Sequence, residues 1–296
     1  MALPKVSIVI PSYKSGHFEQ CLRSAIGQTY LNTEILVSDN CPTEEIRDIC
    51  RKFPSVLYQR NSVVSTENVL SSLFSAKGVY IKPLFDDDLL HPFAIERMVA
   101  AMELHDDVQL VFSKSARIDA ANLRLEDRRP FQQDGIISGR DMIRLMTLTF
   151  KNVVGEFSTI LFRRDKIWKL GSNRIVSYGG KKFSLGLIDV AFYFSLVRDS
   201  SAYYIDEELS YFRYDLSTGS NSNPAANPDF GHVAADWIEL LIEGLRQDII
   251  AREEFRGAKN LVDSFSASFG IFPEVRQVKA CYEQICDTFD STIGPR

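Results

Sequence analysis

The sequence has no long hydrophobic run. No window approaches the roughly eighteen uninterrupted apolar residues that a membrane-spanning helix requires. The first residues, MALPKVSIVI, lead directly into a β-rich segment and lack the layout of a signal peptide. We therefore expect no transmembrane segment and a cytoplasmic location, with peripheral association at the inner face of a membrane left open.

Cysteine pairs and an excess of basic residues are also missing. The five cysteines form no CxxC motif and are odd in number, so we expect reduced thiols. A formal net charge of -5 provides no basic face for broad nucleic-acid binding, and we expect no nucleic-acid partner. Because 45% of the residues are hydrophobic and 25% are charged, the composition is typical of a folded globular protein.

Glycine is scarce at the one turn where a large class of enzymes needs it. The first β-rich run, residues 5–10, is followed by the sequence PSYKSG. A dinucleotide-binding dehydrogenase requires a glycine-rich turn after its first strand. A hydride-transferring dehydrogenase is therefore set aside.

The first hundred residues alternate between β-rich runs and amphipathic segments. Strands are predicted at residues 5–10, 34–38, 56–59 and 79–84, and the helices between and after them lie around residues 18–26, 43–52, 66–76 and 92–104. Strands and helices at this spacing imply right-handed crossovers. The fold class is therefore α/β, with a mostly parallel, doubly wound sheet and helices on both faces.

The later residues continue the pattern less regularly. The expected elements are a strand at 108–112, an irregular connection or hairpin at 113–134, a helix at 138–147, a strand at 158–162, a short helix at 165–170, a mobile loop at 174–186, a helix at 187–197 and two β runs at 202–205 and 209–214. After the polar segment 217–228, apolar residues recur at helical spacing. Residues 217–296 are therefore expected to form a C-terminal helical extension, with later helices around 255–265 and 273–289.

An acidic turn follows the fourth predicted strand. Residues 79–92 read VYIKPLFDDDLLHP, so three adjacent carboxylates, Asp86, Asp87 and Asp88, come directly after a buried apolar run. Adjacent acids repel one another, and a divalent cation or a hydroxyl-bearing ligand would balance them. The alternative is an Asp-rich helix cap, because a helix N-terminus attracts negative charge.

Polar residues also follow the first two strands. Ligands of doubly wound sheets bind outside the carboxyl ends of the strands. Pro11 to Tyr13, Asp39 with Asn40, and the acidic turn all lie at such ends. We therefore expect these segments to converge on one crevice.

Six segments, taken together, carry a family resemblance. The runs SIVIPSY, ILVSDN, GVYIKPLFDDDLLHP, FSTILFRR, LIDVAFYFSL and YYIDEELSYFR resemble, in order and spacing over residues 4–215, the family 2 nucleotide-sugar glycosyltransferases. That family has a single-domain, Rossmann-like A-type fold. The resemblance implies a nucleotide-sugar-binding half at 1–105 and an acceptor-binding, catalytic half of the same domain at 106–216.

The resemblance also implies roles for individual residues on the donor side. The residues expected to bind the base and ribose are Pro11, Ser12, Tyr13, Asp39 and Asp86. Asp87 and Asp88 are expected to bind Mn²⁺ or Mg²⁺ at the donor diphosphate, with Asp87 as the best ligand and with Asp88 alternatively holding the turn or the sugar. The family often places its first acid one position earlier, where this chain has Phe85, so the match depends on the three acids that remain.

The expected catalytic base is Asp189, which matches the family's acid at the start of a late helix. Its neighbours Ile188 and Val190 are apolar, and such surroundings should raise its pKa. The alternative is an acid that only caps the helix. The expected donor or acceptor contacts are Glu156, Ser158, Lys182 and Arg213, and His232 is left open as a further metal contact.

The function that the resemblance implies is transfer of a sugar, with inversion and with a metal ion, from a nucleoside diphosphate sugar to an acceptor hydroxyl. The expected acceptor is a glycan or lipid-linked glycan in the synthesis of a surface polysaccharide. One alternative is a non-catalytic, transferase-like binding or scaffold protein, and another is an Asp-dependent phosphatase with Asp86 as nucleophile and Asp88 as acid. The C-terminal helices are expected either to pair subunits, to bind another enzyme, or to pack on their own domain.

Overall fold

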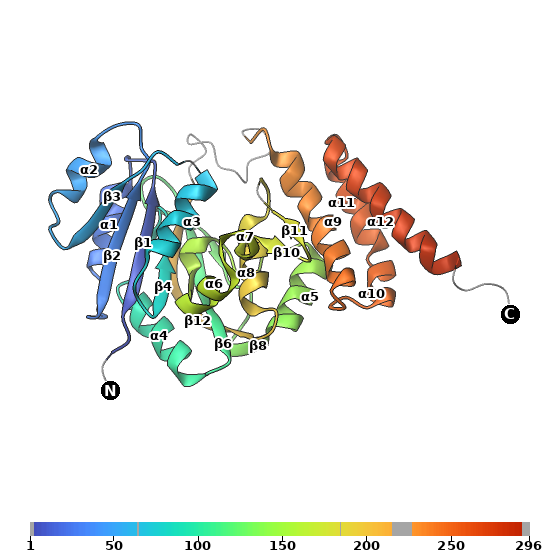
Figure 1. The fold of residues 1–296 in the computed structure, drawn as a ribbon, viewed down its shortest axis with the longest axis horizontal. Coiled ribbons are helices and arrows are strands. Elements are labelled where there is room, and N and C mark those ends of the chain that lie inside the picture. Colours follow the sequence, from blue (N-terminus) through green and yellow to red (C-terminus); the bar gives the residue numbers. More distant parts are fainter. Residues whose placement is uncertain (1–2, 64, 184, 215–226, 292–296) are drawn as a thin grey trace.

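The computed structural model describes residues 3–63, 65–183, 185–214 and 227–291. Within these residues, ten strands form one sheet in the order β3-β2-β1-β4-β9-β6-β12-β5, with β7 beside β6 and β8 beside β12. Helices lie on both faces of this sheet, and a group of C-terminal helices lies at one end of the molecule (Figure 1). The predicted α/β fold with a C-terminal helical extension is therefore confirmed.

The strands are β1 (Val6–Ser12), β2 (Thr33–Asp39), β3 (Val56–Arg60), β4 (Tyr80–Pro83), β5 (Leu89–Leu90), β6 (Val108–Ile118), β7 (Arg124–Arg128), β8 (Gly135–Ser138), β9 (Ile160–Arg163) and β12 (Ser201–Arg213), with a separate two-stranded pair, β10 (Ser177–Tyr178) and β11 (Lys181–Lys182). β1 pairs in parallel with β2 and β4, and β2 pairs in parallel with β3. β9 is antiparallel to both of its neighbours, β4 and β6. The sheet is therefore mostly parallel, as expected.

The helices are α1 (Phe18–Ile26), α2 (Glu45–Cys50), α3 (Ser65–Ser75), α4 (Ala94–Leu104), α5 (Gly139–Thr149), α6 (Arg164–Leu170), α7 (Ser172–Ile175), α8 (Ile188–Val197), α9 (Phe230–Arg246), α10 (Arg252–Gly257), α11 (Lys259–Phe269) and α12 (Pro273–Ser291), with a 3₁₀ turn η1 (Phe157–Thr159) before β9. Most of these elements lie within a few residues of their predicted positions. The predicted polar segment 217–228 falls largely outside the described residues.

Two predictions about the main sheet are wrong, and the loop predicted at 174–186 instead contains the end of α7 and the paired strands β10 and β11. The two β runs predicted at 202–205 and 209–214 are one strand, β12, which pairs with β6 along its length. The polar stretch between the two runs stays in the strand, and the pairing shifts register between Ile205 and Ser210. The segment 113–134 is more regular than expected, because β6 continues to Ile118 and forms a hairpin with β7. In both places a neighbouring strand compensates for weak local alternation.

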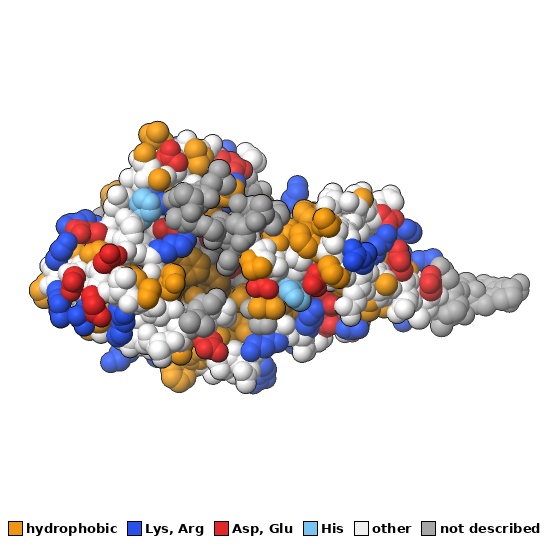
Figure 2. Space-filling view, turned by 90° about the horizontal axis from the view of Figure 1, so that it is seen from above, with side chains coloured by type: hydrophobic (Ala, Val, Ile, Leu, Met, Phe, Trp, Pro, Cys, Tyr) orange, Lys and Arg blue, Asp and Glu red, His pale blue; other side chains and the backbone are white. Residues whose placement is uncertain are grey.

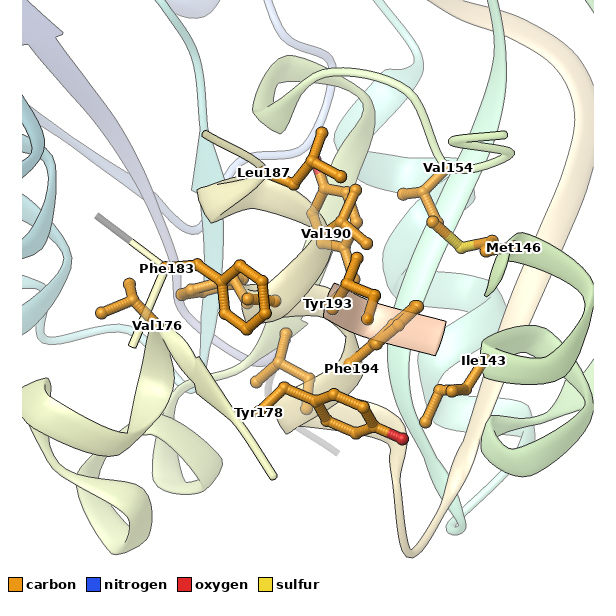
Figure 3. Close-up of a cluster of buried hydrophobic side chains, with 14 of the residues drawn as sticks. Ile143, Met146, Val154, Val176, Tyr178, Phe183, Leu187, Val190, Tyr193 and Phe194 are labelled. Atoms are coloured by element: carbon orange, nitrogen blue, oxygen red, sulfur yellow. The ribbon is translucent and has the colours of Figure 1, made fainter. Parts of the chain in front are cut away.

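Two apolar cores cover the two faces of the sheet. One core packs α1, α2 and α4 on one face, and the other packs α3, α5 and α8 on the opposite face. Figure 3 shows part of the second core, where Tyr193 and Phe194 of α8 lie among side chains of α5 and of the segment before α8. Helix α8, which carries Asp189, has seven of its ten residues in the interior.

The C-terminal helices continue the second core. Trp237, Ile238 and Leu241 of α9 are buried in the same cluster as the side chains of α5 and α8. Helix α9 contacts α5 on one side and α12 on the other. The apolar face of α9 is therefore covered by the chain itself, while pairing with a second subunit or another enzyme stays a prediction.

No helix among the described residues is both long enough and apolar enough to cross a membrane.

Candidate functional site

The carboxyl ends of β1, β2 and β4 meet at one edge of the sheet, which is the upper edge in Figure 1. The backbone N–H of Asn40 donates to the carbonyl of Ser12 at 3.0 Å, so the segments after β1 and β2 adjoin. Figure 2 looks onto this edge and shows the surface hollowed near its centre, beside residues that are not described. The predicted convergence of the three segments is therefore observed.

Asp86 connects the acidic turn to the segment after β1. One of its carboxylate oxygens accepts hydrogen bonds from the backbone N–H groups of Tyr13 and Lys14, both at 2.6 Å. Its side chain is buried, and that burial, together with the charge of Asp87, raises the pKa of Asp86 to about 6. In this structure, Asp86 fixes the loop that was predicted to hold the base and ribose.

Asp88 is turned away from solvent. One of its oxygens accepts from the Ser158 hydroxyl, and the other accepts from the backbone N–H of Arg213 at 3.0 Å. It is fully buried, and burial raises the pKa of Asp88 well above its usual value. Both oxygens hold neighbouring segments, so the metal role predicted for Asp88 stays a prediction that the arrangement does not favour.

Arg213 is only 3% exposed and braces the acidic turn from below. Its guanidinium donates to the Asp87 carbonyl at 2.9 Å, to the Asn122 side chain at 2.7 Å and to the Asp119 carbonyl. These contacts tie the end of β12 and the β6–β7 hairpin to the turn. The predicted contact of Arg213 with the donor stays a prediction.

Asp87 is the most accessible of the three acids, with 18% of its side chain exposed. Lys14 lies beside it, and the two form an ion pair with 3.2 Å between Nζ and Oδ2. Of the three acids in the turn, Asp87 is therefore the best placed to reach a ligand above the sheet edge.

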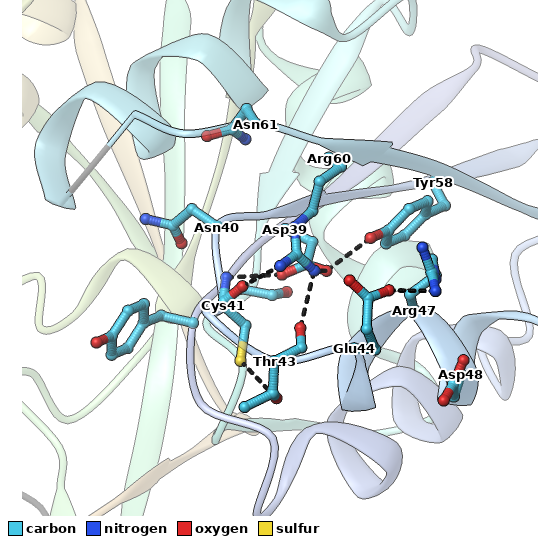
Figure 4. Close-up of polar contacts among 12 residues, drawn as sticks. Asp39, Asn40, Cys41, Thr43, Glu44, Arg47, Asp48, Tyr58, Arg60 and Asn61 are labelled. Carbon is cyan, nitrogen blue, oxygen red and sulfur yellow. Dashed lines mark hydrogen bonds and ion pairs between the residues drawn. The ribbon is translucent and has the colours of Figure 1, made fainter.

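Asp39 lies at the centre of a polar network (Figure 4). One of its oxygens accepts from the backbone N–H of Cys41 at 2.7 Å, and the other accepts from the Tyr58 hydroxyl at 2.7 Å and the Arg60 guanidinium at 2.8 Å. The side chain is fully buried. Asp39 therefore shapes the loop after β2, and its predicted direct contact with base or ribose stays untested.

The remaining residues predicted to bind the nucleotide differ in exposure. Pro11 and Ser12 are buried within β1, and the Ser12 hydroxyl donates to the carbonyl of Ile10 at 3.0 Å. Tyr13, by contrast, is 58% exposed at the end of the strand. Of these three side chains, only that of Tyr13 is exposed, and the predicted contacts of all three with the nucleotide stay predictions.

The loop from Asn152 to Ser158 connects the acidic turn to Asp189. At one end, Ser158 donates to Asp88, and its Oγ accepts from the backbone N–H of Phe85 at 3.0 Å. At the other end, Asn152 donates to Asp189 Oδ2 at 2.9 Å. Between them, the Phe157 ring lies 5.8 Å from that of Phe85 and 5.7 Å from that of Tyr193. Asp88 and Asp189 are thus held by the two ends of one short loop.

Asp189 is the second residue of α8 and is half-buried. Burial raises the pKa of its carboxyl to about 6, and the nearby charge of Glu156 adds to the rise. Glu156 itself accepts a hydrogen bond from the Arg128 guanidinium of β7. Burial is the main cause of this rise, and polar groups of Asn152 and Glu156 lie close to the carboxyl, so the role of Asp189 as base stays a prediction.

Two further predicted contacts lie outside this group. Lys182 is exposed in β11, and the neighbouring Lys181 pairs with Glu239 of α9 at 2.7 Å. His232 lies in the first turn of α9. The roles predicted for Lys182 and His232 stay predictions.

Four residues of the site were not found from the sequence: Lys14, Lys82, Arg128 and Asn152. Lys82 is fully buried, and its Nζ donates to the carbonyls of Pro83 and Ser158. Burial lowers the pKa of Lys82 to about 7. Lys82 could have been found, because a lysine inside an apolar strand is unusual. Nothing in the local sequence distinguishes Asn152 or Arg128 from surface residues.

The described residues contain no cluster of three or more His, Cys, Asp or Glu side chains that could surround a metal ion. The acidic turn offers one accessible carboxylate, that of Asp87, while Asp86 and Asp88 hold the backbone. Mg²⁺ in phosphate-transfer and related sites is commonly held by one or two carboxylates, together with water and substrate phosphates. The residues present therefore fit a cation that arrives with a diphosphate, but not one held by the protein alone.

Comparison with known proteins agrees with this fold. The family model described as "Glycosyl transferase family 2" matches residues 7–171, which is 165 of the 296 residues. A crystal structure of S. aureus TarS 1-349 in complex with UDP-GlcNAc has a TM-score of 0.62 and 14% identity, covering 83% of this chain and 70% of that one. At that identity, the likeness shows a shared fold.

The curated relatives differ in how much of their length this chain covers. An uncharacterised protein, MT1568, of Mycobacterium tuberculosis (strain CDC 1551 / Oshkosh) is 26% identical over 230 residues, covering 73% of this chain and 69% of that protein. Chondroitin synthase of Pasteurella multocida (strain Pm70) is 31% identical over 106 residues, covering 32% of this chain and 10% of the synthase. The chain spans only 19% of the length of a further relative. Because the family model matches more than half of its residues, the protein belongs to glycosyl transferase family 2.

Proposed function

We propose that the protein transfers a sugar from a nucleoside diphosphate donor to an acceptor hydroxyl, with inversion at the sugar. The observation that carries the proposal is the loop from Asn152 to Ser158, which holds Asp88 of the acidic turn at one end and Asp189 at the other. Such a transfer needs a base at the acceptor and a charge-neutralising group at the donor diphosphate, which in this proposal is the cation at Asp87, the neighbour of Asp88. Their connection through one short loop supports a single site.

Asp189 is the general base in this proposal. It removes the proton from the acceptor hydroxyl as that oxygen attacks the anomeric carbon, and the bond from that carbon to the diphosphate breaks on the opposite face. The raised pKa of Asp189 supports this role, because a base works best when its pKa lies near the working pH. Asn152 donates to Oδ2 of this carboxylate and thereby helps to orient it.

Asp87 is the protein ligand of a divalent cation, Mn²⁺ or Mg²⁺, that binds together with the donor diphosphate. The cation would neutralise the negative charge that the leaving diphosphate develops. Asp87 and Lys14 sit side by side, so one carboxylate and one ammonium are both available to phosphate oxygens and their cation. Asp86 and Asp88 hold the turn that carries them.

The donor and acceptor classes are drawn from relatives. TarS was crystallised with UDP-GlcNAc, which makes UDP-sugars the first donors to test. The chondroitin synthases among the relatives build polysaccharides, which supports a glycan or lipid-linked glycan as the acceptor. Synthesis of a surface polysaccharide at the inner face of a membrane is the process we propose.

A panel of nucleotide sugars tests the proposal, with binding followed by thermal shift and turnover by release of nucleoside diphosphate, each with and without Mn²⁺. We expect one donor to raise the melting temperature more than the others, and Mn²⁺ to increase that shift. We also expect nucleoside diphosphate to be released only when an acceptor is present. Nucleotide binding without turnover across donors and acceptors would favour a scaffold. Hydrolysis of a phosphomonoester with no need for nucleotide would favour a phosphatase.

A further inference from the structure

We propose that helix α9 of the C-terminal extension positions Asp189, by holding the segment that leads into α8, with Asp236 as the principal positioning residue. We call residues 177–183 together with Gly186 and Leu187 the lead segment. The inference rests on the proposed function, because it assigns Asp189 the role of base. It gives the extension a part in catalysis beyond covering the apolar core.

The most direct contact joins α9 to the start of α8. Asp236 accepts a hydrogen bond from the backbone N–H of Leu187 at 3.0 Å. Leu187 is the N-cap residue of α8, and Asp189 stands two positions later. Asp236 is only 7% exposed, so this bond is shielded from water and fixes where the helix begins.

Two glycines let the lead segment approach α9 closely. A Cβ added at Gly186 would lie 2.1 Å from Asp236 Oδ2 and 3.0 Å from the Cα of Val233. A Cβ added at Gly179, where φ is +61°, would lie 2.0 Å from Glu243 Oε2. No other residue type fits at either position without moving the helix or the segment.

An ion pair adds a third point of contact. Lys181 of β11 pairs with Glu239 at 2.7 Å, with roughly a third or less of either side chain exposed. Asp236, Glu239 and Glu243 are spaced three and four residues apart, so they lie along one face of α9. That acidic row faces the lead segment at its middle and at its end.

The lead segment is in turn packed onto α8 (Figure 3). Tyr178 and Phe183 are buried, and the Tyr178 ring lies 5.2 Å from that of Phe194 in α8. A shift of α9 therefore moves the segment and the first turn of α8 together. Asp189 is held from this side by α9, through Leu187, and from the other side by Asn152.

The test compares Asp236→Ala with Asp236→Asn, in the full chain and with a donor that turns over. We expect Asp236→Ala to lower kcat by about tenfold or more, because a misplacement of ~1 Å at a reacting group costs on the order of 10²-fold. The donor KM should stay within about twofold, since the acidic turn is held by other contacts. Asp236→Asn keeps an acceptor for the Leu187 N–H and should restore most of kcat.

Glu254→Gln is the matched control. Glu254 of α10 joins the same extension to the main domain through Arg144 of α5, but it does not contact the lead segment. It should lower the melting temperature without lowering kcat. If it lowers kcat as much as Asp236→Ala does, the extension acts only through overall stability and the inference is overturned.

Hydrogen–deuterium exchange separates this inference from the proposed function. Asp236→Ala, and the surface variant Lys181→Met, should speed exchange in peptides covering residues 177–183 and at the Leu187 amide, relative to Glu254→Gln. Faster exchange in a protein that transfers no sugar would support the contact while refuting the function. Unchanged exchange at Leu187 in both variants would overturn the inference, whatever the activity.

Discussion

Asp189 is the residue whose proposed role can be tested most directly by a single substitution. Replacing it with Asn keeps the side-chain shape but removes the base, so transfer should fall by about 10²–10⁴-fold. Nucleotide affinity, measured by calorimetry, should stay nearly unchanged, because the acidic turn is intact. The control is Asp165→Asn, which changes an exposed acid of α6 whose partner is Lys169. Normal turnover by the Asp189→Asn variant would refute the assignment of the base.

The raised pKa of Asp189 predicts how the reaction rate depends on pH. A general base acts in its deprotonated form, and burial raises the pKa of Asp189 to about 6. The rate should therefore be full above that pKa and should fall about tenfold for each pH unit below it. Steady-state kinetics from about one pH unit below this pKa to about two pH units above it measure the acidic limb and the plateau.

A second buried carboxyl provides a control for that profile. The pKa of Asp236 is also raised to about 6, by burial. The variant Asp236→Asn removes this group and should keep the acidic limb. Loss of the limb in that variant would mean that Asp236, and not Asp189, controls the rate.

Asp87 carries the prediction about the cation. The variant Asp87→Ala should lose the activation by Mn²⁺, because it removes the most accessible carboxylate of the acidic turn. Activity is measured over a range of Mn²⁺ concentrations. The control is Asp48→Ala, an exposed acid of α2 paired with Arg51, which should keep the activation. An unchanged Mn²⁺ response in Asp87→Ala would exclude Asp87 as the metal ligand.

The acids of the candidate site could be predicted from the sequence, but their hydrogen-bond partners could not. A run of three acids after an apolar strand, and one acid at the start of an apolar helix, are visible in the chain itself. The partners of Asp88 and Asp189, Ser158 and Asn152, lie about 37 or more positions away in sequence, so only the fold brings them together. That Asp88 holds the turn was one of the expectations from the sequence, whereas the contact of Asp86 with the backbone after β1 was not predicted.

At the scale of elements, the start of α5 is packed against the end of α8. A Cβ added at Gly139 would lie 1.7 Å from the carbonyl oxygen of Val197. Gly139→Ala should therefore reduce the free energy of unfolding by about 2 kcal/mol or more, since overpacking forces the backbone to shift. Urea denaturation measures the loss.

A glycine close by in sequence supplies the comparison. A Cβ added at Gly135 in β8 meets no atom within 4 Å. Gly135→Ala should change the free energy of unfolding by only about 0.5 kcal/mol. Equal losses for the two variants would show that the contact between α5 and α8 is not tight.

Element positions were predictable where short apolar, β-rich runs alternate with amphipathic segments of helical period. The alternation in residues 5–112 gave the strands and helices of the first half nearly to their ends. β12 was divided in two, because residues between Ile205 and Leu209 are polar and interrupt the alternation. Its continuity comes from pairing with β6, a contact between segments about ninety residues apart in sequence.

At the scale of the whole molecule, the C-terminal helices and the main domain share one core. A chain that ends at Tyr214 would lose α9 and would expose the apolar side chains of α5 and α8 that it covers. We expect such a chain to aggregate or to lose cooperative unfolding, as followed by size-exclusion chromatography and thermal denaturation. A truncated monomer with an unchanged melting temperature would show that the extension is an independent unit.

The composition change after residue 228 predicted the extension but not its partner. An apolar helical stripe requires a covering surface and does not specify which one. The glycines that admit the lead segment to α9 were visible in the sequence only as signs of a loop. Their role depends on side chains of α9 about fifty residues later.

The loop from Asn152 to Ser158 limits where this chain can be recombined with a homologue. Consider a hybrid enzyme that joins the N-terminal part of this chain to the C-terminal part of a homologue. Such a hybrid can pair Ser158 or Asn152 with an acid from the other parent. It avoids this only if the crossover lies outside the loop and both acids come from the parent that supplies the loop. Shuffling parents at residue 106 would bring in a foreign loop beside the native Asp88. The smallest exchange that keeps both acids with their hydrogen-bond partners replaces the loop from Asn152 to Ser158 together with Asp88 and Asp189.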